Sequence, residues 1–171
     1  TTDGGYIIAG VRSSGIGSTD LWLIKTDNSG NQQWDLIVGG NDTEDGYSVD
    51  QTADGGYIVS GLTNTNSAGS YDLLLVKADA SGNLQWQQTY GGLRSDVGRS
   101  VQQTYDGGYI TAGYTYSYGA GSYDFWLIKL EPEAATSDFN LTIAPQNPPI
   151  VIPASGGFFD YNVSLDNNTQ Q

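Results

Sequence analysis

Apolar residues in this chain fall into short runs that are separated by turns rich in Gly, Asp and Asn. Between residues 48 and 90, four such runs predict strands at 48–52, 57–61, 72–79 and 84–90. The third run is apolar at successive rather than alternate positions, it has Asp and Lys near its ends, and it is too short for a helix. A strand of this kind is buried on both faces. We therefore expect a further sheet on each side of it.

The same pattern recurs along the chain. The sequence Asp-Gly-Gly-Tyr-Ile begins at Asp3, Asp54 and Asp106, at spacings of 51 and 52 residues. Each copy leads to an apolar run that begins with Asp and ends with Lys, at 20–25, 72–77 and 124–129. Because Asp-Gly is a strong hairpin signal, we expect strands two to four of one four-stranded unit, all of a second, and strands one to three of a third. These ten strands are too few to close a ring of four to eight such units. We expect the rest of a longer chain, or other copies of this one, to complete it.

Two further motifs connect the repeat with known families. The spacing Asp-x-x-Gly-x-x-x-Trp ends at Trp34 and again at Trp86, and a Gly-Gly pair follows each, at 39–40 and 91–92. The spacing resembles the tryptophan-docking repeat of quinoprotein-type propellers, and the Gly-Gly pairs with Tyr and Trp resemble kelch repeats. The whole phrase is most similar to propeller repeats of large secreted bacterial and archaeal surface proteins. Over residues 1–131 this resemblance implies an all-β fold of antiparallel four-stranded β-propeller blades, in an extracellular or cell-surface protein. It implies no quinoprotein chemistry, because no calcium-quinone ligand set matches.

Residues 132–171 follow a different pattern. A Pro-containing polar stretch predicts a linker. Beyond it, apolar residues alternate with polar ones at Phe139, Leu141 and Ile143, and again from Phe159 to Leu165. The stretch resembles the opening strands of an immunoglobulin-like β-sandwich of the kind found along bacterial surface proteins. Such a partial sandwich has an open edge, which we expect further sequence or a strand of another chain to cover.

Charge and composition limit the classes of partner that this chain is expected to bind. Nineteen acidic and six basic residues give a net charge of −13, which repels nucleic-acid phosphates and anionic membrane surfaces. No apolar run is long enough to span a bilayer, so we expect no direct membrane insertion. The chain begins at Thr1 without a signal sequence, and we interpret it as an internal piece of a longer, processed precursor.

Catalysis is not expected. The chain has no His and no Cys, which excludes Ser-His-Asp and Cys-His nucleophiles, His metal sites and zinc-activated water within it. A pair of carboxylates for glycoside hydrolysis remains conceivable. However, acidic residues recur at matching turn positions of the repeat, as Asp3, Asp54 and Asp106 and as Asp20, Asp72 and Asp124. A catalytic acid is normally unique, whereas a turn-forming Asp is repeated. We therefore predict no catalytic residue and no cofactor other than calcium.

Calcium has two candidate positions. The acidic loop 41–46 resembles the start of an EF-hand, although Thr52 occupies the twelfth position where Glu is required. Asp42, Glu44 and Asp45 are the candidate ligands there. The turns 27–31 and 79–83 also offer oxygens to calcium, and the alternative interpretation is an Asx-type hairpin turn closed by Gly.

Binding residues are expected on one rim of the repeat, where the loops 12–18, 63–69 and 115–121 vary while the strands barely change. The third loop is rich in Tyr, Ser and Gly, as adaptable contact surfaces are, and the alternative is a solvated, tolerant loop. The candidate ligand-binding residues are Tyr114, Tyr116, Tyr118 and Tyr123. The four tryptophans suit sugar stacking, but their fixed places in the repeat favour packing between units. Candidate N-glycosylation sites are Asn41, Asn140, Asn162 and Asn167.

The leading hypothesis from the sequence is a non-catalytic cell-surface or secreted structural and adhesion protein, which self-assembles through incomplete β-sheets. Its expected partners are other copies of itself or the rest of a longer chain. The alternative is a carbohydrate-binding propeller that contacts glycans with its Tyr-rich rim loops.

Overall fold

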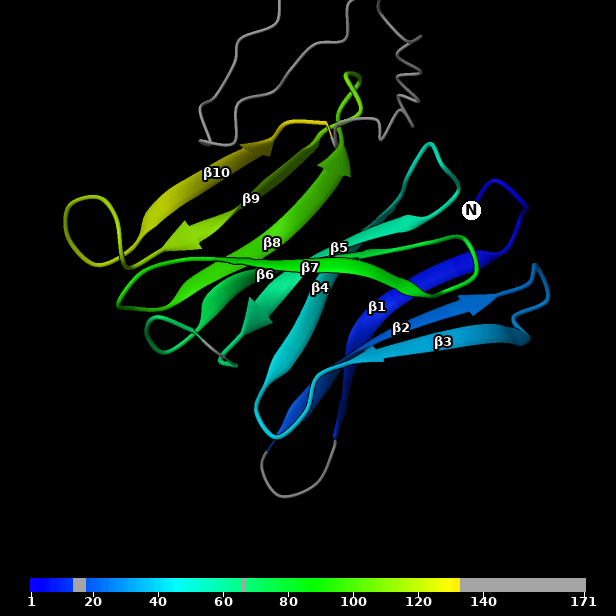
Figure 1. Ribbon diagram of the computed structural model, residues 1–171, viewed down its shortest axis with the longest axis horizontal. Helices are drawn as coiled ribbons and strands as arrows, with labels where there is room; N and C mark the ends of the chain where they lie inside the picture. Colours follow the sequence, from blue (N-terminus) through cyan, green and yellow to red (C-terminus); the bar gives the residue numbers. More distant parts are fainter. Residues whose placement is uncertain (14–17, 66, 133–171) are drawn as a thin grey trace, which may run out of the picture. The chain divides into compact units, whose positions relative to one another are not determined.

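The computed structural model describes residues 1–13, 18–65 and 67–132, and these residues form ten β-strands and no helix (Figure 1). The strands make three antiparallel sheets of three, four and three strands, as the repeat predicts. Within the described residues there is thus no helix that would be long and apolar enough to cross a membrane. The predicted sandwich strands lie outside the described residues.

Each sheet is a simple meander in which every strand pairs with the next one along the chain. The first sheet contains β1 (Tyr6–Ser13), β2 (Thr19–Thr26) and β3 (Gln32–Val38). The second contains β4 (Glu44–Gln51), β5 (Tyr57–Thr63), β6 (Asp72–Ala78) and β7 (Leu84–Tyr90). The third contains β8 (Asp96–Gln103), β9 (Tyr109–Thr115) and β10 (Asp124–Leu130).

The Asp-Gly-Gly motif forms the turn between the first two strands of a unit. Between β4 and β5, the Gly55 amide donates a hydrogen bond of 2.9 Å to the Thr52 carbonyl, and the Gly56 amide donates one of 2.9 Å to Asp54 Oδ1. Gly55 has φ of 83°, a left-handed conformation that costs glycine little. The predicted hairpin is therefore present, and its Asp caps the turn.

A β-bulge interrupts the first strand of the unit. The register of β4 against β5 shifts between Gly46 and Ser48, and β8 shifts against β9 between Gly98 and Ser100. A bulge breaks the alternation of side chains. This is why the pattern predicts a strand only from residue 48, whereas β4 begins at Glu44.

The three sheets pack face to face through two apolar cores. The core between the first and second sheets is built mainly from β2, β5 and β6, with Leu21, Leu23, Tyr57, Val59, Leu74 and Val76 as members. The core between the second and third sheets includes Ile58, Leu73, Leu75, Val101 and Tyr109. Alternate residues of β6 thus enter opposite cores, and all seven of its residues are buried. The prediction that this strand is covered on both faces is confirmed.

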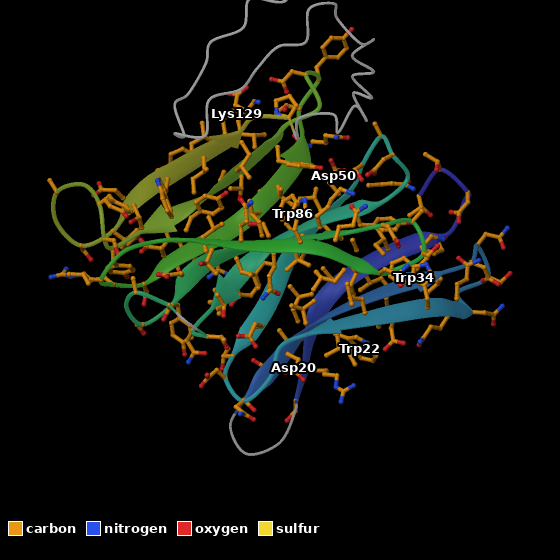
Figure 2. The ribbon with its side chains drawn as sticks, in the orientation of Figure 1. Asp20, Trp22, Trp34, Asp50, Trp86 and Lys129 are labelled. Atoms are coloured by element: carbon orange, nitrogen blue, oxygen red, sulfur yellow. The ribbon has the colours of Figure 1, made fainter. Side chains whose placement is uncertain are left out.

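Polar contacts connect the first strands of the second and third sheets. The Val101 amide donates a hydrogen bond of 3.1 Å to Ser48 Oγ, and the Gln103 amide donates one of 3.0 Å to Asp50 Oδ2. These contacts fix β8 against β4 at the same register along both strands. Figure 2 shows Asp50 among the side chains of the second sheet.

Candidate functional site

The repeated Asp and Lys residues form an ion pair in each sheet. The Lys Nζ lies 2.7 Å from the Asp carboxylate in the pair Lys25–Asp3, and 2.8 Å from it in the pairs Lys77–Asp54 and Lys129–Asp106. Lys77 Nζ also donates to the Ala78 carbonyl and to Gln85 Oε1. Because the same pair recurs in every sheet, these acids have a structural role in the hairpin turn.

The lysines keep the turn carboxylates ionised. The hydrogen bond from Lys25 is the main cause that holds the pKa of Asp3 well below its usual range, and the bond from Lys129 does the same for the pKa of Asp106. Burial raises the pKa of Asp54, but the hydrogen bonds from Lys77, Thr52 and the Gly56 amide outweigh it and lower this pKa to about 2.

The tryptophans of the last strands pack against the next sheet. Trp34 of β3 lies against Tyr57 with 5.5 Å between ring centroids, and Trp86 of β7 lies against Tyr109 at 5.8 Å (Figure 2). Trp126 packs against the core between the second and third sheets. Packing between units is therefore confirmed for these three residues. Trp22 instead donates a hydrogen bond of 2.9 Å from Nε1 to the exposed Asp35.

Three of the four predicted ligand-binding tyrosines come together. Tyr114 lies near the end of β9. Tyr116 and Tyr123 lie at the two ends of the loop that connects β9 to β10. Their ring centroids are 5.6 to 6.0 Å apart, and the three rings line a shallow depression. We call Tyr114, Tyr116 and Tyr123 the tyrosine cluster.

An arginine extends the tyrosine cluster. The Arg99 guanidinium carbon lies 4.4 Å from the Tyr47 ring centroid and 5.4 Å from that of Tyr114, so the cation stacks on both rings. Burial is the main cause that raises the pKa of Tyr47 to about 12, and the charge of Asp45 adds to it. The Tyr47 hydroxyl therefore remains protonated at neutral pH and donates to Asp45 at 3.1 Å. Sequence reasoning missed Arg99 and Tyr47, since both come from first strands distant from the loop.

Tyr118 lies apart from the tyrosine cluster. Its ring packs on Trp126 at 5.6 Å between centroids, and its hydroxyl donates a hydrogen bond of 2.8 Å to the Gly91 carbonyl. Its contacts connect the rim loop to the end of β7. These contacts indicate a structural role for this residue.

The three predicted calcium ligands of the acidic loop point to different neighbours. Asp42 and Glu44 line a cleft of about 600 Å³, whereas Asp45 accepts hydrogen bonds from Thr19 and Tyr47. In the described part of the chain, no three acidic side chains gather into a metal-binding group.

Glu44 faces a carboxylate that sequence reasoning had assigned to a turn. Asp20 of β2 and Glu44 of β4 come from adjacent sheets, and both are buried. An ideal Cβ on Gly39 would lie 2.3 Å from Asp20 Oδ1 and 2.8 Å from Glu44 Oε2, so the two carboxylates converge beside this glycine. Figure 2 shows Asp20 near the end of the first sheet. The only signal in the sequence was that an acid recurs at this position of every unit.

The turns 27–31 and 79–83 are Asx-type turns. Asp27 Oδ1 accepts hydrogen bonds from the amides of Ser29 and Asn31, and Asp27 Oδ2 accepts one from the Asn31 side chain. Asp79 makes the same contacts in the second turn. These bonds lower the pKa of both carboxyls, with the Asn side chain as the main cause. Because the turn itself uses the carboxylate oxygens, the structure favours the turn over calcium binding here.

Of the candidate glycosylation sites, Asn41 lies exposed in the turn between β3 and β4. Asn140, Asn162 and Asn167 lie outside the described residues.

No protein-family model matches the chain, and no curated protein is found to be similar to it.

Proposed function

We propose that this chain is a non-catalytic segment of a β-propeller-type repeat array, in a cell-surface or secreted protein with a structural and adhesive role. In this proposal each sheet is one blade, and the array grows by stacking further blades on its two outer faces. In the isolated chain, the occupant of each outer face is the opposite outer face of a second copy.

One observation carries the proposal: equivalent residues are buried or exposed according to whether another sheet covers them. Tyr57 is 2% exposed beneath the first sheet, whereas its equivalent Tyr6 on the outer side of the first sheet is 58% exposed. Leu73 is 1% exposed beneath the third sheet, whereas its equivalent Phe125 is 75% exposed. Both outer faces thus carry the residues that elsewhere in the array form a core.

The exposed apolar residues on each outer face are contiguous along the strands. Tyr6 and Ile8 share one face of β1, and Phe125 and Leu127 share one face of β10. Exposed apolar surface of this kind marks an interaction site. Because the two faces are the complementary sides of one repeating interface, contact between them is heterologous and forms rings or open stacks.

Self-association is tested with two single variants, each of which introduces one charge on one of the two outer faces. Sedimentation velocity over a range of concentrations is expected to show association of the wild-type chain, and a shift toward monomer for Ile8→Lys and for Leu127→Lys. The control is Leu93→Lys, which adds the same charge at an exposed position of the loop between β7 and β8. A wild-type chain that stays monomeric at every concentration contradicts the assembly part of the proposal.

A second candidate function is carbohydrate binding by the tyrosine cluster. It is supported by three aromatic rings around a shallow depression, beside a stacked Arg99. Aromatic faces stack on the apolar faces of sugar rings, and the tyrosine hydroxyls and the guanidinium offer hydrogen bonds to sugar hydroxyls.

Glycan binding is tested on a glycan array and then by calorimetry with a retained glycan. Tyr116→Ala and Tyr123→Ala are each expected to weaken binding by roughly 2- to 10-fold. Tyr105→Ala, a fully exposed tyrosine in the turn between β8 and β9, serves as control. Retention of no glycan, or equal binding by Tyr116→Ala, rules this function out.

A further inference from the structure

The Asp20–Glu44 pair contains buried oxygen atoms without a partner. Asp20 is 6% exposed and Glu44 is 4% exposed. Asp20 Oδ1 and Glu44 Oε2 receive no hydrogen bond, although these are the two atoms that converge beside Gly39. Burying an ionised carboxylate without compensation is costly, and two like charges at close range add to the cost.

We propose that Asp20 and Glu44 bind a calcium ion at the junction of the first and second sheets. A divalent cation compensates both charges and occupies the lone pairs that the protein leaves unused. The site joins β2 to β4, so the ion would add a link between the first and second sheets to their apolar core and to the hydrogen bond from Thr19 to Asp45.

The neighbours of Glu44 are arranged as supports of a ligand. Thr63 Oγ1 donates a hydrogen bond of 2.7 Å to Glu44 Oε1, and Thr65 Oγ1 donates to the same atom. These two bonds hold the carboxylate through Oε1. The other oxygen, Oε2, is the one that converges with Asp20 Oδ1 beside Gly39. Contacts of this kind orient metal ligands in known sites.

The chemistry of the site selects calcium. Its donor atoms are all oxygens, which suit a hard cation, and the chain has no His or Cys to favour a transition metal. The cleft of about 600 Å³ reaches Glu44 and is also lined by Gly39, Asn41 and Asp42, which gives access to solvent and further oxygen ligands. Calcium accepts such irregular coordination more readily than magnesium does.

The equivalent pair at the next junction differs by one methylene group. Asp72 and Asp96 converge beside Gly91 in the same way, at 2.2 Å and 2.9 Å from its ideal Cβ. Asp96, however, is already satisfied: Oδ2 accepts from the Gly92 amide at 2.9 Å and from Ser117 Oγ at 2.6 Å, and Oδ1 accepts from Thr115. Only Asp72 Oδ1 lacks a partner there. We therefore place the calcium site at the first junction and use the second as its control.

Calcium titration of the whole chain by calorimetry tests the site. We expect one saturable site with a Kd on the order of 10⁻⁴ to 10⁻³ M, the range of the weaker calcium-binding modules. Asp20→Asn and Glu44→Gln are each expected to weaken it by at least about 10-fold, since each removes a ligand charge. Asp72→Asn, the same change at the second junction, is expected to leave this affinity unchanged.

Thermal unfolding distinguishes a calcium-binding site from a pair of carboxylates that has only a structural role. Calcium is expected to raise the unfolding midpoint of the wild type, and not that of Glu44→Gln. In chelator, Glu44→Gln is expected to be at least as stable as the wild type, because it removes one of two facing charges. The proposal is overturned by a wild type whose midpoint does not rise with calcium, by equal calcium affinity of Glu44→Gln, or by equal affinity for magnesium.

Discussion

At the scale of single residues, the lysine that closes the third strand of each unit places a charge inside the sheet. The side chain of Lys77 is 2% exposed, whereas that of Lys129, which donates to Asp106 and the Leu130 carbonyl on the uncovered face of the third sheet, is 33% exposed. Lys77 Nζ makes three hydrogen bonds, to Asp54, the Ala78 carbonyl and Gln85. A buried charge is tolerated because its donors are all used.

Replacing Lys77 by Met is expected to destabilise the chain by about 2–3 kcal/mol, because the buried bond to the Ala78 carbonyl is lost and Asp54 and Gln85 lose their partner. The measurement is the free energy of unfolding from urea titration. Lys129→Met removes the equivalent bonds to Asp106 and the Leu130 carbonyl at a more exposed position and is expected to cost less. Equal losses for the two variants would contradict the role given to burial.

Asp54 is expected to make stability depend on acid pH. Its pKa is lowered to about 2 in the folded chain, against about 3.9 for an unfolded Asp. The unfolded chain therefore binds the proton more readily, so this stabilisation is complete above about pH 4 and is lost as the pH falls through about 2. The Asp54 side chain is 55% exposed, so solvent reduces the effect.

The measurement is the urea midpoint between neutral pH and pH 2 for wild type and Asp54→Asn. Asn keeps the acceptor for the Gly56 amide but has no charge. The difference between the two proteins is expected to shrink below about pH 4. Parallel curves would show that Asp54 does not carry this dependence.

At the scale of elements, the last strand of each unit contributes a tryptophan to the next sheet. Trp86→Ala is expected to cost about 2–3 kcal/mol, less than for a fully buried Trp because this residue is half-buried. Trp22→Ala is the control, since Trp22 is bonded to the exposed Asp35, and about 1 kcal/mol or less is expected. Denaturant unfolding measures both, and a larger loss for Trp22→Ala would contradict the packing assigned to Trp86.

The strands were largely predictable from the sequence, because each unit repeats the same short apolar runs bounded by turn residues. The predicted strand 84–90 matches β7, and 72–79 exceeds β6 by one residue. The start of β4 was missed because its first residues read as an acidic loop and a bulge interrupts its alternation. Burial of β6 on both faces followed from its unbroken apolar run.

The Asp20–Glu44 pair was not predictable in the same way. The two residues belong to different sheets, and their convergence depends on how those sheets pack rather than on any local pattern. The tyrosine cluster was easier to predict from the sequence, because Tyr116 and Tyr123 share one loop. The stacking of Arg99 on Tyr47 joins two sheets and again required the packing.

At the scale of the whole described array, burial decreases from the middle sheet to both outer faces. All residues of β5 and β6 are buried, whereas β10 has residues exposed at alternate positions. Regions with few buried contacts unfold locally at lower free energy than the core does. The outer sheets are therefore expected to be less stable than the middle one.

Hydrogen exchange read by mass spectrometry tests this gradient. Amides of β5 and β6 are expected to exchange most slowly and those of β10 fastest, since each outer sheet lacks one of the two covers that protect β6. If the outer faces associate as proposed, raising the protein concentration is expected to slow exchange in β1 and β10 and to leave β6 unchanged, because mass action stabilises only the elements at the new contact. Leu127→Lys is expected to remove that concentration dependence. Identical exchange rates in all ten strands at every concentration would contradict both the gradient and the association.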